Sequence, residues 1–146
     1  MREEIRKEER VVVNEYKKYI AEDGKEFDTK RECQNYELDL AIEKAEEKTK
    51  QFIIDVDITP LTLYDDFREC DTKWYKVNSI DDLETVKEYY SLKSGDEYGY
   101  NVYSFPAIVC IADYDDYYDV YTLENIMKQT EGFFDKFNIK INFEGR

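Results

Sequence analysis

The stretch FPAIVCIADYDDYYDVYT, residues 105–122, sets the predicted architecture of this chain. Its first eight residues form the most hydrophobic run in the sequence, and a short apolar run of this kind is typical of a strand that is buried on both faces. Residues 113–116 predict a turn, and residues 117–121 predict a second strand that pairs back on the first. We therefore expect a β-hairpin in the centre of a sheet, with Cys110 inside it.

A helix and a closing strand are expected after this hairpin. The helix is predicted over residues 122–137, where apolar residues recur at mixed helical spacing. The residues that we expect it to bury are Leu123, Ile126, Met127, Phe133, Phe134 and Phe137. Residues 139–143 alternate apolar and polar side chains, which predicts a short strand.

Another strand and helix are expected before the hairpin. Residues 73–77 predict the strand. Ser79 is a favoured N-cap residue, and the acidic residues that follow it suit the positive end of a helix dipole. Gly95 is the kind of residue at which a helix ends.

The N-terminal part predicts a hairpin followed by a helix. Residues 11–22 favour a strand, Asp23-Gly24 a tight turn, and residues 25–27 a short returning strand. Thr29 with Glu32 fits a capping box, which predicts a helix that runs to about residue 50.

These elements predict an α+β fold, in which an N-terminal ββα unit precedes an antiparallel or mixed sheet covered by two helices. We divide the chain into a hairpin-helix module, residues 1–51, and an α+β domain, residues 52–146, with one continuous domain as the alternative. The second part opens with a strand over residues 52–58, which would turn Ile54 and Val56 inward.

The composition excludes several classes of function. The net charge is −14, from 35 acidic and 21 basic residues, and no region is dominated by lysine and arginine. This disfavours direct binding of nucleic acid and favours a partner that is itself basic. The chain contains no histidine, which excludes Ser-His-Asp and Cys-His catalysis and histidine-based zinc sites.

Cysteine use and hydropathy predict a location. The three cysteines lie far apart, and an odd number leaves one unpaired in any disulfide scheme. No apolar run is long enough to cross a membrane, so we expect no membrane contact and a cytoplasmic location in a host cell, with reduced thiols. No metal-ligand spacing or glycine-rich phosphate loop is present, and we expect no cofactor and no metal.

The acidic, tyrosine-rich hairpin is the candidate partner-binding site. Its residues are Asp113, Tyr114, Asp115, Asp116, Tyr117, Tyr118 and Asp119. Carboxylates that recur along a strand can face lysines and arginines that normally hold phosphates, so an acidic protein can compete for a basic groove. The alternative is a solvated hairpin on a generally acidic surface.

A second candidate is the Asp-x-Asp-x-Thr pattern at Asp55 and Asp57, which resembles haloacid-dehalogenase-type phosphatases. The resemblance implies Asp55 as nucleophile, Asp57 as general acid/base and Mg²⁺ as cofactor. Ile58 stands where these enzymes usually have glycine, and Pro60 follows. We therefore favour solvent-facing aspartates on a strand and do not expect an enzyme.

The block YIAEDGKEFDTKRECQNYE, residues 19–37, resembles a hairpin-helix module in small acidic proteins of phages and mobile elements from low-GC Gram-positive bacteria. The matching residues are Tyr19, Ala21, Asp23, Gly24, Glu26, Phe27, Thr29, Glu32, Cys33, Tyr36 and Glu37. Some anti-CRISPR and other anti-defence proteins look similar in size, acidity and this opening. The resemblance implies a stoichiometric inhibitor that binds a bacterial nuclease or CRISPR effector.

The expected function is therefore inhibition of a bacterial nucleic-acid-handling complex by binding to a basic groove, as in an anti-CRISPR protein. The alternatives are the Mg²⁺-dependent phosphatase and a structural or assembly subunit of a phage-derived particle, which would self-associate. A homodimer stays open as the oligomeric state.

Overall fold

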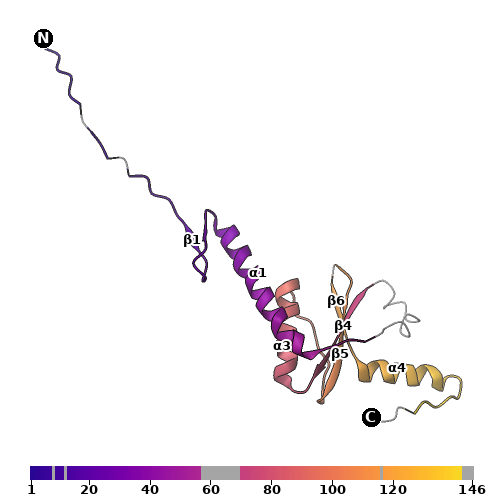
Figure 1. Ribbon diagram of the computed structural model, residues 1–146. Helices are drawn as coiled ribbons and strands as arrows, with labels where there is room; N and C mark the ends of the chain where they lie inside the picture. Colours follow the sequence, from indigo (N-terminus) through magenta and orange to yellow (C-terminus); the bar gives the residue numbers. More distant parts are fainter. Residues whose placement is uncertain (8, 12, 57–69, 116, 143–146) are drawn as a thin grey trace. The chain divides into compact units, whose positions relative to one another are not determined.

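The computed structural model describes residues 1–7, 9–11, 13–56, 70–115 and 117–142 (Figure 1). Within them the fold is α+β, as predicted, with a hairpin and helix followed by a four-stranded antiparallel sheet and further helices. The chain forms two compact units, residues 1–39 and 40–146, and the boundary falls within the first helix. The division proposed after residue 51 stays a prediction.

The first unit contains the predicted hairpin. Strands β1 (Tyr19–Ile20) and β2 (Glu26–Phe27) pair antiparallel. Gly24 lies in the turn with φ of 90°, a conformation that glycine adopts without steric cost. The carboxylate of Asp23 accepts a hydrogen bond of 2.5 Å from the hydroxyl of Tyr36 on the following helix. The turn is thus tied to the helix by a side-chain contact as well as by the chain.

The predicted first strand over residues 11–22 is wrong in length, because among the described residues of this range only Tyr19 and Ile20 are paired. The returning strand is two residues long and offers no further partners. The described residues before Tyr19 form no helix or strand, and Val11 and Tyr16 are 91% and 78% exposed. Strand propensity alone does not hold a strand, because backbone amides and carbonyls need a neighbour to pair with.

Helix α1 (Lys30–Thr49) begins and ends close to the predicted positions. The Thr29 hydroxyl accepts a hydrogen bond of 3.2 Å from the backbone amide of Glu32, which is half of the predicted capping box. Cys33 is buried, as expected of a small apolar residue on the inner face. A short 3₁₀ turn, η1 (Lys50–Phe52), leads into the sheet.

The second unit is built on one antiparallel sheet with strand order β3-β4-β5-β6. The strands are β3 (Ile53–Ile54), β4 (Asp71–Val77), β5 (Ala107–Asp113) and β6 (Tyr118–Thr122). Strand β5 pairs on both sides, with Cys110 opposite Trp74 on β4 and Tyr121 on β6. The most hydrophobic run of the sequence therefore does form an interior strand.

Each face of the sheet packs against a different set of elements. One face carries the buried Tyr75, Val77, Val109 and Ile111, which pack against helix α3 (Ile80–Ser94) and against Ala45 near the end of α1. The other carries Trp74 and Cys110, which pack against Ile126 of helix α4 (Leu123–Asp135). Since successive side chains of a strand point to opposite faces, β5 needs apolar residues at consecutive positions.

The boundaries of α3 follow the predicted caps, and α4 has a cap of the same kind. The Ser79 hydroxyl accepts a hydrogen bond of 3.2 Å from the amide of Asp82, and α3 ends at Gly95 with φ of 77°. Thr122 caps α4 in the same way, through a hydrogen bond of 3.2 Å from the amide of Asn125. Local sequence signals therefore set both helices.

Several expectations at the C-terminal end are wrong. Ile126 is buried as predicted, but Phe133 and Phe137 are 56% and 62% exposed. Residues 139–142 form no strand, because no neighbouring strand in the described part pairs with them; residue 143 lies outside the described residues. Among the described residues, no helix combines the length and the apolar character needed to cross a membrane.

Candidate functional site

The predicted site lies at the turn between β5 and β6. Asp113 pairs with Tyr118 at the end of the two strands, and the amide of Tyr114 donates a hydrogen bond of 3.0 Å to the carbonyl of Tyr117. The carboxylate of Asp113 accepts a hydrogen bond of 2.9 Å from the amide of Asp115, which has φ of 67°. Aspartate tolerates this left-handed conformation, and its local hydrogen bond stabilises the turn.

Two tyrosine rings are stacked at this turn. The ring centroids of Tyr114 and Tyr117 lie 4.9 Å apart with 15° between the planes. Tyr117 is 50% exposed, whereas Tyr114 is half-buried. Burial, with a hydrogen bond to Tyr121, holds the pKa of Tyr114 well above its ordinary value, so its phenol stays neutral. The two rings form a flat aromatic surface in the same turn as the exposed Asp115.

The remaining candidate residues separate onto the two faces of the sheet. Tyr118 packs into the core, where its ring makes edge contacts with Tyr90 at 5.0 Å and Tyr98 at 5.9 Å between centroids. Asp119 follows it on the opposite face, where its carboxylate accepts a hydrogen bond of 3.4 Å from the Tyr121 hydroxyl. Asp116 lies outside the described residues.

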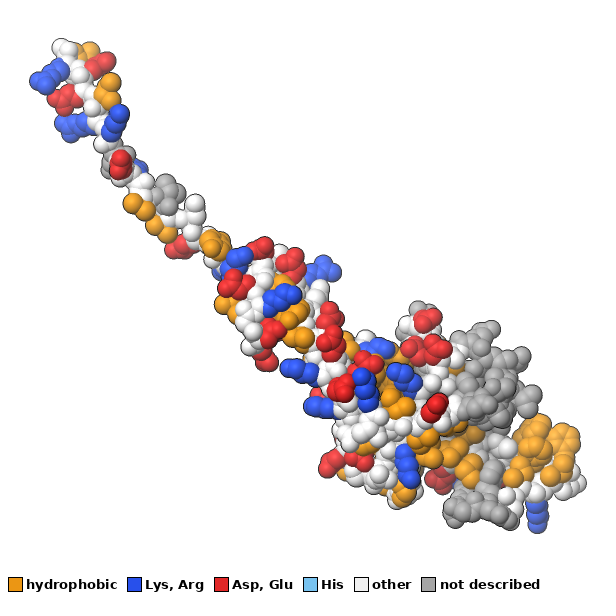
Figure 2. All heavy atoms as spheres, viewed as in Figure 1, with side chains coloured by type: hydrophobic (Ala, Val, Ile, Leu, Met, Phe, Trp, Pro, Cys, Tyr) orange, Lys and Arg blue, Asp and Glu red, His pale blue; other side chains and the backbone are white. Residues whose placement is uncertain are grey.

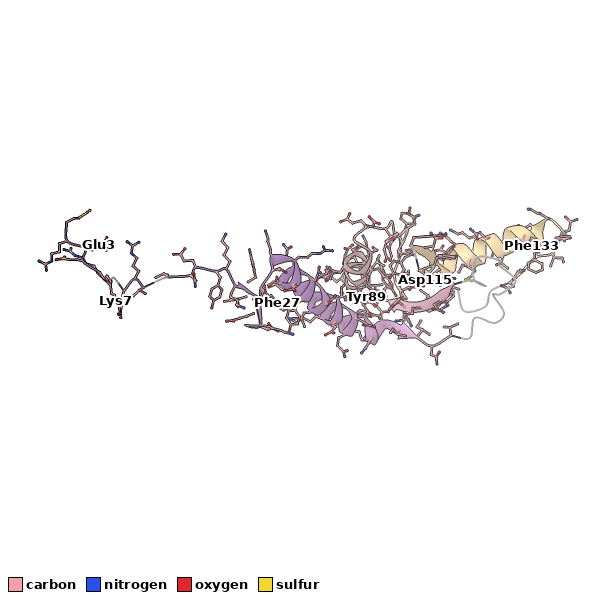
Figure 3. All side chains as sticks on the ribbon, turned by 90° about the horizontal axis from the view of Figure 1, so that it is seen from above. Glu3, Lys7, Phe27, Tyr89, Asp115 and Phe133 are labelled. Carbon is pink, nitrogen blue, oxygen red and sulfur yellow. The ribbon has the colours of Figure 1, made fainter. Side chains whose placement is uncertain are left out.

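The structure therefore divides the predicted site residues by their contacts. Asp115 and Tyr117 are exposed at the turn, and Asp113 and Tyr114 support them. Figure 2 shows acidic side chains gathered at the projecting end of the β5–β6 hairpin, and Asp115 is labelled there in Figure 3. Among the described residues of the hairpin, Asp115 and Tyr117 at this end present an exposed carboxylate and an exposed aromatic ring to solvent.

The phosphatase pattern receives little support from its surroundings. Asp55 is exposed and follows β3, a two-residue edge strand. All strand pairs in the described part of the chain are antiparallel, whereas the compared enzymes place their loops at the ends of parallel strands. Asp57 lies outside the described residues. Val56, expected to point inward, is 41% exposed.

The described part of the chain contains no candidate metal site. There, no group of three or more Cys, Asp or Glu side chains is placed to hold a metal ion. Burial raises the pKa of Cys110 from 9.0 to about 12, so this thiol stays protonated at neutral pH and is a poor nucleophile.

An acidic groove beside α3 was missed by the sequence analysis. Its volume is about 480 Å³, and the residues that line it are Glu84, Lys87, Glu88, Ser91, Leu92, Gly95, Asp96, Glu97 and Tyr98. The helical spacing of Glu84 and Glu88, with the acidic pair that follows Gly95, was the signal that could have found it. The four carboxylates outnumber the single lysine, which itself pairs with Glu84 at 3.4 Å.

Comparison with known proteins found no relative: family models, curated protein sequences and solved structures gave no match to this chain.

Proposed function

We propose that the protein is a non-enzymatic, acidic binding protein of the anti-CRISPR or anti-defence type, which acts in the cytoplasm of a bacterial host. It inhibits a nucleic-acid-handling protein by occupying the basic groove that would hold nucleic acid. The observation that carries this proposal is the end of the β5–β6 hairpin, where one turn holds the exposed Asp115 and the stacked rings of Tyr114 and Tyr117.

Charge supports a basic partner. A chain with a net charge of −14 repels nucleic acid and acidic proteins and is attracted to positive grooves. Such grooves gain much of their affinity for nucleic acid from the release of counterions when phosphates are neutralised. Carboxylates on a projecting turn can replace those phosphates, and the bound nucleic acid is then displaced.

The tyrosine pair supports contact with arginine or lysine side chains. Guanidinium and ammonium groups are attracted to aromatic faces. The chain already uses this contact internally, because the ammonium group of Lys93 lies 5.6 Å from the ring centroid of Tyr118 and 5.5 Å from that of Tyr89. Stacking holds Tyr117 in place, so less side-chain entropy is lost when a partner binds.

The test uses charge removal without backbone strain. Asp115→Lys would place a long side chain at a φ of 67°, whereas asparagine tolerates that conformation, so Asp115→Asn changes the charge alone. Glu43→Gln, on the exposed side of α1, is the matched control. The readout is DNA cleavage by a guide-loaded CRISPR nuclease, with this protein titrated in and the ionic strength varied.

We expect the wild-type protein and Glu43→Gln to inhibit cleavage alike, and Asp115→Asn to inhibit about tenfold less well. Inhibition should weaken with added salt and with added competitor DNA. Equal inhibition by Asp115→Asn and Glu43→Gln would show that the hairpin is not the contact site. No inhibition of any nuclease tested, with no partner retained from a Gram-positive lysate at low salt, would end the inhibitor proposal.

A second variant isolates the aromatic contribution. Tyr117→Ser removes the exposed half of the stacked pair, and Tyr103→Ser removes another exposed tyrosine from a different loop. The first should weaken inhibition and the second should not, because Tyr117 lies in the same turn as Asp115 and Tyr103 does not.

A further inference from the structure

The apolar face of α4 continues beyond the sheet that covers its first half. At the start of the helix, Leu123 and Ile126 pack against the sheet beside Trp74. Phe133, seven residues after Ile126 and so on the same side of the helix, is 56% exposed. Phe137, in the turn that follows the last helical residue, is 62% exposed. One continuous apolar stripe is therefore covered at one end and open at the other.

The open end is an ordered cluster of aromatic rings. The ring centroid of Phe133 lies 5.4 Å from that of Phe134 and 5.5 Å from that of Phe137, both in edge contact. After the helix, Asn138 turns the chain with φ of 57°, and the amide of Ile139 donates a hydrogen bond of 3.1 Å to the carbonyl of Phe134.

This turn brings Ile139, 49% exposed, back to the same end of the helix. We call these four residues, Phe133, Phe134, Phe137 and Ile139, the aromatic end of α4. It lies at the far end of the helix in Figure 3, and apolar side chains gather there in Figure 2.

The net charge of the segment around α4 indicates which kind of partner this surface can bind. Between residues 123 and 142, three lysines balance three carboxylates, so the segment has no net charge. These residues are Lys128, Lys136, Lys140, Glu124, Glu131 and Asp135. The net charge of −14 is carried by the rest of the chain. Two copies can therefore meet at this end without bringing their net negative charges together, which they could not do at the acidic hairpin or at the groove beside α3.

We infer that the aromatic end of α4 is a self-association surface, on which the same surface of a second copy of this chain packs about a two-fold axis. A two-fold contact places equivalent apolar residues against each other. Four side chains a copy cover less than the roughly 800 Å² per partner of a standard interface, so the dimer should form in the micromolar range or weaker.

The experiment is sedimentation equilibrium of the full chain over a wide range of concentration. Phe133→Ser with Phe137→Ser removes the exposed rings and leaves the buried half of the stripe intact. Val13→Ser with Tyr103→Ser is the control, because it removes exposed apolar side chains elsewhere. Circular dichroism checks that each variant is folded. Phe137→Glu is a second variant, which adds like charge to the contact.

We expect a monomer–dimer equilibrium in the wild type and the control, and a dissociation constant at least about tenfold higher in both Phe variants. Added salt should strengthen the dimer, because it screens repulsion between two acidic chains. Monomers at all concentrations, an unchanged dimer in the Phe variants, or open-ended assembly would each overturn the inference. Binding of this end only to a foreign protein or to vesicles would do the same.

This inference and the proposed function fail separately. Asp115→Asn should leave the dimer unchanged, and salt should weaken inhibition while it strengthens the dimer. A dimer without inhibition would contradict the proposed function and support this inference. Inhibition by a protein that stays monomeric would contradict this inference and support the proposed function.

Discussion

The hydroxyl oxygens of Tyr75 and Tyr90 lie 2.6 Å apart in the core of the second unit and share one hydrogen bond. Tyr75 is fully buried on the sheet, and Tyr90 is buried on α3. A buried hydroxyl without a partner costs free energy, so this bond fixes how the helix sits on the sheet. It gives the helix a position that apolar contacts alone would set less exactly.

Removing one hydroxyl should destabilise the fold by about 1–3 kcal/mol, because the other is left buried. Tyr75→Phe and Tyr90→Phe should each cause such a loss, since each leaves the other hydroxyl buried without this partner. The measurement is urea unfolding of both single variants and the double variant. Single-variant losses that simply add in the double variant would show that the bond is not shared.

Stability should fall as the pH rises above about 9. Burial raises the pKa of Cys110 from 9.0 to about 12 and raises the pKa values of Tyr75 and Tyr90 above 10.0. The folded state then holds protons that the unfolded chain has released, so each further rise in pH favours the unfolded chain until the folded groups also titrate. Urea midpoints at pH 8, 9.5 and 11 should decrease in that order.

Cys110→Ala tests the cause of this decrease. Its midpoint should fall less between pH 8 and 9.5 than that of the wild type, because one of the two buried thiols, Cys110 and Cys33, that titrate first in the unfolded chain is gone. Tyr103→Phe removes an exposed tyrosine and should leave the decrease unchanged. A wild-type midpoint that is constant to pH 11 would contradict the burial of these groups.

Two glycines should respond in opposite ways to replacement by alanine. Gly95 ends α3 with φ of 77°, where a Cβ is strained, so Gly95→Ala should lower stability by about 1 kcal/mol. Gly132 lies within α4, and a Cβ there would meet nothing within 4 Å. Gly132→Ala should raise stability by about 0.5–1 kcal/mol, since alanine favours the helix. Thermal unfolding of both variants checks the two signs.

The cap of α3 can be tested in the same way. Ser79→Ala removes the side chain that accepts the amide hydrogen bond of Asp82 and should cost about 1 kcal/mol. Ser79→Asp should recover most of the loss, because aspartate is also a favoured N-cap. Ser104→Ala, at an exposed position outside the helices and strands, is the control. Equal midpoints for all variants would mean that the cap does not contribute.

Only part of the candidate site could be predicted from the sequence. The pattern at residues 113–119 predicted the turn and its acidity. It did not show that Tyr118 belongs to the core, because the face that a strand residue occupies depends on where the helices pack. Nor did it show the stacking of Tyr114 on Tyr117, which depends on the turn geometry set by Asp113 and Asp115.

The sequence by itself determined the elements whose signals are local. Ser79, Gly95 and the Asp23-Gly24 turn act through hydrogen bonds and backbone angles within a few residues, and the run at 107–112 requires burial wherever it lies. Only the tertiary structure decided which strands gain partners and which apolar faces are covered. Residues 13–18 have strand propensity but pair with no strand in the described part of the chain, and Phe133 has helical periodicity but stays exposed. Pairing and burial need a second segment, and its position is not encoded in the first.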